Sequence, residues 1–345
     1  MQPVAVINAR AAARREIGGV ERWAREVAAR LPALRPDGYV VARPPHALAH
    51  RAGQLWEQIA LPALAARRRA TVVVSPANLA PVAWPRNVLV LHDASTLRHP
   101  EWYGRAYAAW QRALVPALAR RAARVVTVSE FSRAEIAATT GVDADTVAVV
   151  PGGVDERFAP DTPADAARAA LRLSRPYVLT VATQGARKNL GALVPAAELL
   201  AARGVDLVAA GGRRGYLPGG EAAPGIRALG YVEDALLPGL YAGAVAFVLA
   251  SRYEGFGLTC LEAMAAGVPV VAADAGALPE TCGDAALLAD PHDPAAFAAA
   301  LLDCLDDAAL AQRLRAAGPK RAGAFTWDRT VRELDAVVRD AVGSA

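Results

Sequence analysis

The chain has 345 residues, of which 54% are apolar, so it is long enough to form two domains with separate cores. Its formal net charge of +4 is uneven, because residues 1–160 hold 21 basic and 13 acidic residues whereas residues 161–345 hold 17 and 21. Three cysteines spaced 22 residues apart exclude a close zinc-ligand pair and a disulfide framework, and no apolar run reaches the roughly 18 residues of a membrane-spanning helix.

Short β-branched apolar runs alternate with longer Ala-, Leu- and Arg-rich stretches of helical period. The strand-like runs in the first half are 4–8, 39–42, 71–76, 87–93, 124–130 and 147–153. After a Pro-rich interval the second half has 177–183, 205–212, 226–232, 244–251, 268–274 and 286–291, and an amphipathic helix follows near the end of the chain. Continuous apolar strands separated by helices predict parallel sheets covered on both faces. We therefore predict an α/β fold of two doubly wound, Rossmann-like domains that face each other across a cleft, at residues 1–160 and 161–325.

The basic first half is compatible with an anionic membrane surface, an anionic acceptor or nucleic acid. Its Arg clusters at 66–70 and 117–126 are equally compatible with solvated helix ends. Aromatic residues make up 6% of the chain and are not interleaved with these arginines, so we expect no nucleic-acid partner. The chain enters a strand-like run at Val4 without the pattern of a secretory signal. We expect a cytoplasmic protein, with peripheral contact at the inner face of the membrane as an open interpretation.

Ligands of open parallel sheets bind beyond the carboxyl ends of the strands, so the residues after each strand are the first candidates. Gly18 and Gly19 follow the first strand and precede a helix pattern whose unpaired N–H groups suit an anion. A plain glycine turn is the alternative. The spacing is not G-x-G-x-x-G, so the dinucleotide-binding fingerprint is absent.

His92 and Asp93 follow the fourth strand of the first half, with Arg98 and Trp102 a few residues later. A histidine at a strand end can hydrogen-bond a sugar hydroxyl or carry a proton. A His–Asp pair that caps a turn is the alternative.

Two oxygen-rich stretches resemble metal sites. Asp143 and Asp145 form a D-x-D, and Asp290 and Asp293 lie in DPHDP, but both stretches fall where turns are expected. We predict no metal.

In the second half, Arg187 and Lys188 follow the first strand. Lys188 is one of only two lysines among 38 basic residues, the other being Lys320. Two cations beside a helix start suit a pyrophosphate, with Arg as a planar fork and Lys as a point charge. A solvated helix start is the alternative.

The stretch EGFGLTCLE places Glu254 in a loop and Glu262 in the helix that follows. Amides of Gly257, Leu258 and Thr259 can meet a phosphate at the helix start. A carboxylate suits vicinal ribose hydroxyls, and this role fits Glu262, which leaves Glu254 to face the sugar at the other end of the phosphate.

Together these motifs resemble glycosyltransferase family 4, the retaining, nucleotide-sugar-dependent enzymes of GT-B fold. The resemblance rests on GGVERWAREVA, VLHDASTLRHPEWY, VVTVSEFSR, VVPGGVDERFAP, RKNL, the E-x(7)-E segment and ALPETCGDAALLADPHDP, in that order along nearly the whole chain. Their combination is similar to the branch that adds mannose, rhamnose or like sugars to polysaccharide or lipid-linked acceptors. The chain departs from the family pattern at Ala182-Thr183, Ala250 and Thr259-Cys260.

The resemblance implies that no metal or other cofactor is needed and that a nucleoside-diphosphate sugar is the co-substrate. It implies catalytic or pyrophosphate-binding roles for Lys188, Arg187, Glu254 and His92. The donor-binding set is Gly18, Gly19, Gly255, Phe256, Gly257, Leu258, Thr259 and Glu262, and the acceptor side is Asp93, Arg98 and Trp102, with loops around 43–58 and 92–104. The final segment, 326–345, is expected to cross back to the first domain.

We expect a hexose to pass to a hydroxyl of a saccharide, lipid-linked or small-molecule acceptor with retention of configuration. Glu254 is the only plausible nucleophile, but a residue bonded to sugar hydroxyls is poorly aimed at C1, which favours same-face attack assisted by the departing phosphate. Two alternatives stay open. One is a nucleotide-sugar epimerase or hydrolase on the same scaffold, and the other is a non-catalytic anion-binding protein.

Overall fold

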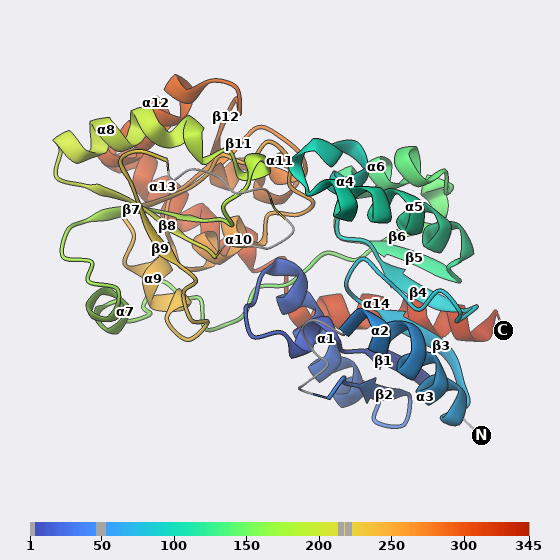
Figure 1. The fold of residues 1–345 in the computed structure, drawn as a ribbon. Coiled ribbons are helices and arrows are strands. Elements are labelled where there is room, and N and C mark those ends of the chain that lie inside the picture. The colour runs from blue at the N-terminus through green and yellow to red at the C-terminus, as the bar shows by residue number, and fades with distance from the viewer. Residues whose placement is uncertain (1–3, 46–52, 213–216, 218–222, 345) are drawn as a thin grey trace. The chain divides into compact units, whose positions relative to one another are not determined.

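A computed structural model describes residues 4–45, 53–212, 217 and 223–344 (Figure 1). Part of the acceptor loop predicted around 43–58, residues 46–52, therefore lies outside the described residues. The chain divides into two compact units, one of residues 1–98, 108–153 and 327–345 and one of residues 99–107 and 154–326. The sequence-based division at residue 160 differs chiefly in residues 99–107, which lie with the second unit.

The first unit is built on a parallel sheet of order β2-β1-β3-β4-β5-β6. Its strands are β1 (Val4–Asn8), β2 (Tyr39–Ala42), β3 (Ala70–Ser75), β4 (Asn87–Val90), β5 (Arg124–Thr127) and β6 (Val147–Val149). Its helices are α1 (Gly19–Leu34), α2 (Gly53–Leu55), α3 (Leu61–Arg67), α4 (Ser95–Arg98), α5 (Arg105–Arg121), α6 (Glu130–Thr140) and α14 (Trp327–Gly343), with a π-helical turn at Trp56–Ala60. The strands are shorter than the apolar runs because the last residues of several runs leave the sheet to form loops.

The second unit has a parallel sheet of order β12-β11-β10-β7-β8-β9. Its strands are β7 (Tyr177–Val181), β8 (Asp206–Ala210), β9 (Ile226–Gly230), β10 (Ala246–Leu249), β11 (Val270–Ala273) and β12 (Ala286–Ala289). Its helices are α7 (Asp165–Ala170), α8 (Val194–Ala202), α9 (Leu237–Ala242), α10 (Leu258–Ala265), α11 (Leu278–Cys282), α12 (Pro294–Asp306) and α13 (Ala308–Ala322). The predicted pair of parallel, Rossmann-like sheets is confirmed.

The strand order of the second sheet fixes where a ligand is expected. From β7 the chain moves outward through β8 to β9, returns to the other side of β7 with β10, and continues outward to β11 and β12. The connections on the two sides of the β7–β10 pair therefore run in opposite directions. In open parallel sheets, ligands bind at the carboxyl ends of the strands at such a switch point. Loops that leave β7 and β10 border this switch point.

Helix α14 belongs to the first unit although it ends the chain. Buried Trp327, Leu334 and Val338 form its apolar side. Its carboxylates bind the first unit as well, because Arg30 Nη1 donates to Asp328 at 2.8 Å and the Tyr39 hydroxyl donates to buried Asp335 at 2.7 Å. None of the helices in the described ranges has the length and apolar character required to cross a bilayer.

Candidate active site

The loop after β7 carries the two predicted cations. Residues Ala186–Lys188 form a 3-10 turn, and Asn189 then adopts a left-handed conformation with φ 54°. A second 3-10 turn follows at Leu190–Leu193, and α8 begins only at Val194. Arg187 and Lys188 therefore lie beside a helical start that is formed by two 3-10 turns, with Asn189 between them, rather than by the α-helix itself.

Asn189 anchors this loop to two others. Its buried side-chain amide donates to the Ala250 carbonyl at 3.1 Å and to the Pro291 carbonyl at 2.8 Å. Ala250 follows β10 and Pro291 follows β12, so one amide group joins the carboxyl ends of three strands. Sequence reasoning quoted Asn189 in the RKNL motif but assigned it no role.

Lys188, Arg187 and Glu254 form one charged cluster across the switch point. Lys188 Nζ donates to Glu254 Oε1, and Arg187 Nη1 lies 3.4 Å from Glu254 Oε2 and donates to the Tyr253 carbonyl at 3.1 Å. The side chains of Lys188 and Glu254 are 12% and 10% exposed. Because two cations face one carboxylate, the cluster carries a net positive charge at the carboxyl ends of β7 and β10, which favours an anionic ligand.

Burial and charge act in opposite directions on the Glu254 carboxyl. Burial alone raises its pKa, but the charges of Lys188 and Arg187 outweigh burial and lower the pKa to about 2. Burial likewise lowers the pKa of the Lys188 ammonium, and the Glu254 carboxylate opposes this. Glu254 is therefore ionised at neutral pH and is a weak base.

Two glycines fix the backbone around Glu254. Gly257 ends the loop with φ 97°, and a Cβ on it would lie 2.7 Å from Leu278 Cδ2. Gly276 has φ 62°, and a Cβ on it would lie 2.6 Å from the Glu254 carbonyl oxygen, which also accepts the Ala277 N–H at 2.9 Å. A side chain at either position is strained by both conformation and contact. Sequence reasoning singled out Gly257 and missed Gly276.

Helix α10 starts directly after Gly257. Leu258 and Thr259 form its first turn and are partly exposed, Gly255 is buried, and the Phe256 ring meets Phe325 edge-on at 5.6 Å. The adjoining Cys260 is fully buried. Its hydrogen bond with the Cys282 thiol, together with burial, raises the pKa of the Cys260 thiol well above its usual value, so it is a neutral packing group.

Glu262 lies in the second turn of α10 and is 3% exposed. Its Oε2 accepts a hydrogen bond from the Tyr241 hydroxyl at 2.8 Å. Tyr241 is fully buried in α9, between Phe158 at 5.6 Å, met edge-on, and Phe247. Tyr241 thus fixes one oxygen of this carboxylate, and nothing in the local sequence around Glu262 points to it.

The remaining predicted residues, apart from Trp102, lie in the first unit. Gly18 caps α1 in an extended conformation and donates its N–H to Glu21 at 3.0 Å, and a Cβ on Gly19 would meet no atom within 4 Å. Asp93 accepts from the Ser95 N–H at 2.9 Å and from its hydroxyl at 2.6 Å, so it forms the turn that leads into α4. These contacts match the turn-forming alternatives for Gly18 and Asp93.

His92 is buried, with its ring edge-on to Trp23 at 5.5 Å. Its Nε2 lies 2.8 Å from the Pro76 carbonyl, which accepts and therefore fixes the proton on Nε2. Burial lowers the pKa of His92, so the ring is neutral at pH 7 with Nδ1 as an acceptor. Arg98 makes a two-bond ion pair with Glu135 at 2.9 and 2.7 Å.

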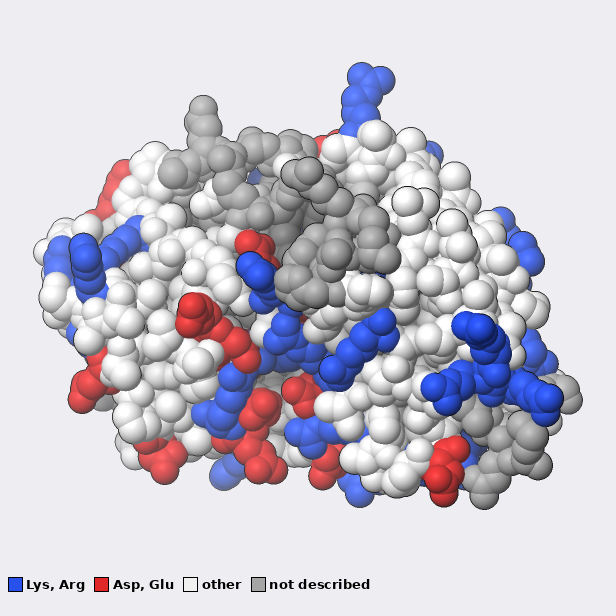
Figure 2. All heavy atoms as spheres, turned by 60° about the horizontal axis from the view of Figure 1, so that its bottom comes forward, with Lys and Arg blue, Asp and Glu red and all other residues white. Residues whose placement is uncertain are grey.

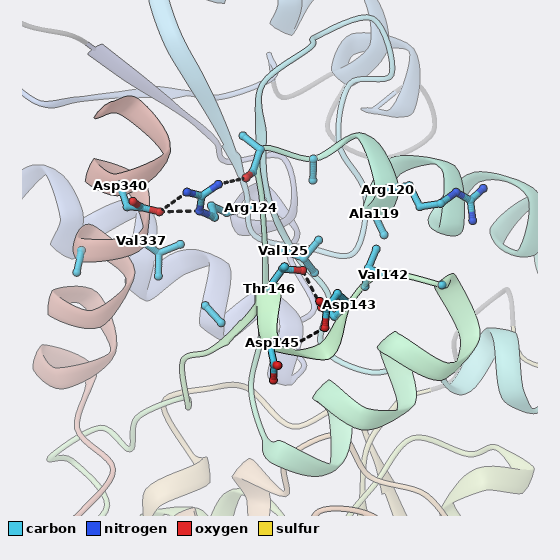
Figure 3. Close-up of a pocket in the computed structure, with 15 residues that line it drawn as sticks. Ala119, Arg120, Arg124, Val125, Val142, Asp143, Asp145, Thr146, Val337 and Asp340 are labelled. Atoms are coloured by element: carbon cyan, nitrogen blue, oxygen red, sulfur yellow. Dashed lines mark hydrogen bonds and ion pairs between the residues drawn. The ribbon is translucent and has the colours of Figure 1, made fainter. Parts of the chain in front are cut away.

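The D-x-D lies at a separate pocket of about 1010 Å³ in the first unit (Figure 3). Asp143 accepts the Asp145 N–H at 3.0 Å, and the Thr146 hydroxyl donates to the Asp143 carbonyl at 2.6 Å, so Asp143 forms the turn before β6. Across the pocket, Arg124 is paired with Asp340 at 2.6 Å. Within the described ranges no group of three or more His, Cys, Asp or Glu side chains is arranged to hold a metal ion.

Sequence reasoning also missed a buried polar cluster after β1. Asn8 Nδ2 donates to Glu57 Oε1 at 2.5 Å, and Arg10 Nε lies 3.2 Å from Glu57 Oε2. Glu57 is 1% exposed and lies on the π-helical turn. No local sequence pattern predicts this cluster, because Glu57 lies about 50 residues from Asn8 and Arg10 in the sequence.

Comparison with known proteins finds a glycosyltransferase family in each half of the chain. Residues 17–158 match the family described as Glycosyltransferase Family 4, and residues 175–307 match the one described as Glycosyl transferases group 1. O-antigen chain mannosyltransferase B of Escherichia coli is 34% identical over 265 residues, which are 70% of this chain and 67% of that protein. D-inositol 3-phosphate glycosyltransferase of Acidothermus cellulolyticus is 34% identical over 244 residues, which are 64% of this chain and 53% of that protein.

Solved structures share the fold at lower identity. Sucrose-phosphate synthase from Thermosynechococcus elongatus superposes with a TM-score of 0.77 at 21% identity, covering 100% of both chains. HepE from Anabaena, in complex with UDP and glucose, gives a TM-score of 0.72 at 18% identity over 98% of this chain and 100% of that chain. The two-domain GT-B fold expected from the sequence is therefore shared with solved glycosyltransferases.

Proposed function

The chain belongs to glycosyltransferase family 4, and we propose from this that it moves a hexose, with retention of configuration, from a nucleoside-diphosphate sugar to a hydroxyl of an acceptor. The observation that carries the proposal is the cluster of Lys188, Arg187 and Glu254 at the switch point between β7 and β10. The UDP-bound HepE structures and the mannosyltransferase relative support a nucleotide-sugar donor.

The donor diphosphate binds Lys188 and Arg187 in this proposal. Both cations now share Glu254, so an incoming diphosphate replaces the carboxylate as their partner. Glu254 is then released to accept hydrogen bonds from the sugar hydroxyls. The N–H groups of Gly257, Leu258 and Thr259 at the start of α10 receive the phosphate oxygens, because an N-terminal helix turn carries unpaired donors.

The ribose of the donor binds Glu262. A carboxylate accepts two vicinal hydroxyls, and the Tyr241 hydroxyl holds Glu262 in one orientation through a charge-assisted hydrogen bond. Because the Tyr241 ring is enclosed by Phe158 and Phe247, its hydroxyl has little freedom to follow the ligand. The carboxylate is therefore preorganised for one ribose position.

Transfer proceeds by same-face attack rather than through a covalent glycosyl-enzyme. Glu254 has a pKa of about 2, which makes it a weak base and nucleophile. The departing phosphate, stabilised by Lys188 and Arg187, accepts the proton of the attacking hydroxyl, and charge stabilisation of this leaving group is the main catalytic effect. His92 of the first unit donates its Nε2–H to the Pro76 carbonyl and is neutral, so it has no acid proton to supply.

The test is incubation with GDP-mannose, UDP-glucose and dTDP-rhamnose, each with and without a mixture of mannosides and lipid-linked saccharides. Acceptor-dependent release of the nucleoside diphosphate is expected for at least one donor. Donor conversion that needs no acceptor supports the epimerase or hydrolase alternative. Absence of turnover with every donor, together with salt-sensitive binding of polyanions, supports the non-catalytic anion-binding alternative.

Peripheral contact with an anionic membrane is a finer part of the proposal. On the first unit, Leu55 and Ile59 are 65% and 69% exposed one helical turn apart. The exposed cations Arg67, Arg68 and Arg69 lie at the end of α3 and directly after it. Lys and Arg side chains gather at the right-hand edge of the face shown in Figure 2. Exposed apolar side chains next to clustered arginines suit a surface of anionic lipid.

Vesicle co-sedimentation tests this contact. The wild type is expected to sediment with phosphatidylglycerol-containing vesicles and not with pure phosphatidylcholine, and Leu55→Glu with Ile59→Glu removes the binding. Leu199→Glu is the matched control, because Leu199 is 46% exposed and lies in the second unit. Equal sedimentation of wild type and double variant rules out this surface.

A further inference from the structure

The loop after β3 holds the buried His92 of the first unit. Strand β3 ends at Ser75, the next two residues leave the strand, and Asn78 then returns to the neighbouring strand β4. The Asn78 N–H donates to the carbonyl of Val90, the last residue of β4, at 2.9 Å. The side-chain Oδ1 of Asn78 accepts the His92 N–H at 2.7 Å. One residue of the loop therefore bonds the backbone of β4 on both sides of the turn toward His92.

Asn78 can make both bonds because its backbone is left-handed, with φ 62°. Asparagine is one of the few residues with a Cβ that adopts this conformation at little cost. Within the described ranges, the only other asparagine with a positive φ is Asn189, which joins three strand ends in the second unit. A left-handed asparagine thus ties loops together at the carboxyl ends of the strands in each of the two sheets.

The loop directs one carbonyl at the imidazole of His92. Pro76 lies between Ser75 in the sheet and Asn78 on β4, so its peptide is held from both sides, and its carbonyl lies 2.8 Å from Nε2. A carbonyl only accepts, so Nε2 carries the proton and Nδ1 of the neutral ring is a bare acceptor. In the opposite tautomer, two lone pairs would face each other across this contact.

The remaining contacts of His92 hold the residue and leave Nδ1 open. The His92 carbonyl accepts the Ser132 hydroxyl of α6 at 3.2 Å, and the ring packs edge-on against Trp23 of α1. The charged groups that act on the ring are Glu21 of α1 and Asp93 in its own loop, and the loop after β3 carries no charge. Within the described ranges Nδ1 has no hydrogen-bond partner. Nδ1 is therefore the ring atom that a ligand can use.

We propose that Asn78 is a positioning residue for His92, which it holds as a hydrogen-bond acceptor for a substrate hydroxyl rather than as a carrier of protons. The inference rests on the proposed function, because the acceptor serves the reaction only if a substrate hydroxyl reaches it. Asn78 acts through the ring: it places the Pro76 carbonyl, this carbonyl fixes the tautomer, and the tautomer decides whether Nδ1 accepts or donates. Without the Asn78 side chain the loop loses its bond to the His92 N–H, and both tautomers become accessible.

Nitrogen NMR of labelled histidine side chains reads the tautomer directly, because protonated and bare ring nitrogens give well-separated signals. Spectra of the full chain are recorded at about pH 8, above the pKa of an ordinary histidine, and His92→Ala identifies the signals of His92. Asn78→Gly keeps the left-handed backbone without the side-chain acceptor, whereas Asn78→Asp restores an acceptor oxygen. Arg172→Gly is the matched control, because Arg172 is exposed in the second unit with φ 54°.

Wild type, Asn78→Asp and Arg172→Gly are expected to show the Nε2–H tautomer of His92 alone. Asn78→Gly is expected to show a mixture of the two tautomers, because the Pro76 carbonyl is then free to move away from Nε2. Retention of the single tautomer in Asn78→Gly overturns the inference.

Kinetics test whether the tautomer matters for the reaction. The kcat/KM for acceptor-dependent diphosphate release is expected to fall about 10-fold in Asn78→Gly and to recover in Asn78→Asp. In a His92→Ala background, Asn78→Gly is expected to cause no further loss, since the residue acts through the ring. Additive losses in the double variant contradict the positioning role. A tautomer mixture in Asn78→Gly, when wild type releases no nucleoside diphosphate with any donor, retains the link between Asn78 and His92 and defeats the proposed transfer.

Discussion

Replacing Lys188 by alanine tests the charged cluster most strongly. In wild type, Lys188 and Arg187 face one carboxylate, and the variant leaves only Arg187, 3.4 Å from Glu254. The local charge falls from +1 to zero, so the site loses the excess positive charge that attracts and stabilises the leaving diphosphate. Removing one preorganised electrostatic partner of a developing anion commonly costs about 2.7–4 kcal/mol, which corresponds to roughly 100-fold or more in kcat.

The chain offers a matched control for this variant. Lys320, the only other lysine, is exposed in the last turn of α13. Acceptor-dependent diphosphate release is measured for both variants at saturating donor and acceptor. Lys320→Ala is expected to match wild type and Lys188→Ala to lose about 100-fold in kcat. Turnover of Lys188→Ala within a few-fold of wild type would refute the assignment of this lysine to the leaving group.

Three further predictions concern groups that position the site. Tyr241→Phe is expected to weaken calorimetric binding of the nucleoside diphosphate by about 10-fold, since a hydrogen bond to a charged group contributes about 1.5–3 kcal/mol. The control is Tyr177→Phe, which removes a buried hydroxyl bonded to the Leu240 carbonyl at 2.7 Å and is expected to leave this affinity unchanged. Gly276→Ala is expected to reduce kcat at least about 10-fold through its contact with the Glu254 backbone. Gly141→Ala, at φ 76° with no atom within 4 Å of its Cβ, is expected to lower only thermal stability. Equal activity of the two variants would contradict the role of Gly276 in positioning Glu254. Because the Glu254 pKa is lowered from 4.5 to about 2, its ion pair stabilises the fold above pH 4.5 and loses this contribution as pH falls toward 2. The free energy of unfolding in urea is therefore expected to fall more steeply with acid in wild type than in Glu254→Gln. Parallel curves for the two proteins would contradict this prediction.

The sheets could be predicted because each strand is a short apolar run between turn signals. Val72, Val73 and Val74 are completely buried in the first sheet, and Val178 and Leu179 in the second, as continuous apolar runs require. The ends of the strands were less predictable. The run at 87–93 predicts a longer strand than β4, which ends at Val90. His92 and Asp93 lie in the loop after the strand, where contacts with Pro76 and Ser95 determine their conformation.

Part of the site could also be predicted from the sequence. A rare lysine and two glutamates beside glycines mark Lys188, Glu254 and Glu262, since charge and backbone freedom are properties of the local sequence. The groups that orient them are not local. Asn189 bonds carbonyls 61 and 102 residues away, and Tyr241 meets Glu262 across 21 residues.

The aromatic contacts of Trp102 and His99 illustrate the same limit. Trp102 was predicted on the acceptor side from its place after the HD motif, but its stacking on His99 and the contact of His99 with Tyr253 depend on how the chain returns to the second unit. A single sequence without covarying relatives carries no signal for a contact between residues 99 and 253.

The anomeric configuration of the transferred sugar tests the central claim most directly. Proton NMR of the product formed from an α-linked nucleotide hexose reports both the new glycosidic bond and its stereochemistry. Same-face transfer at the Lys188–Glu254 cluster predicts an α-glycoside whose formation is lost in Lys188→Ala and preserved in Lys320→Ala. A β-glycoside, or an α-glycoside formed equally well by Lys188→Ala, would contradict the account.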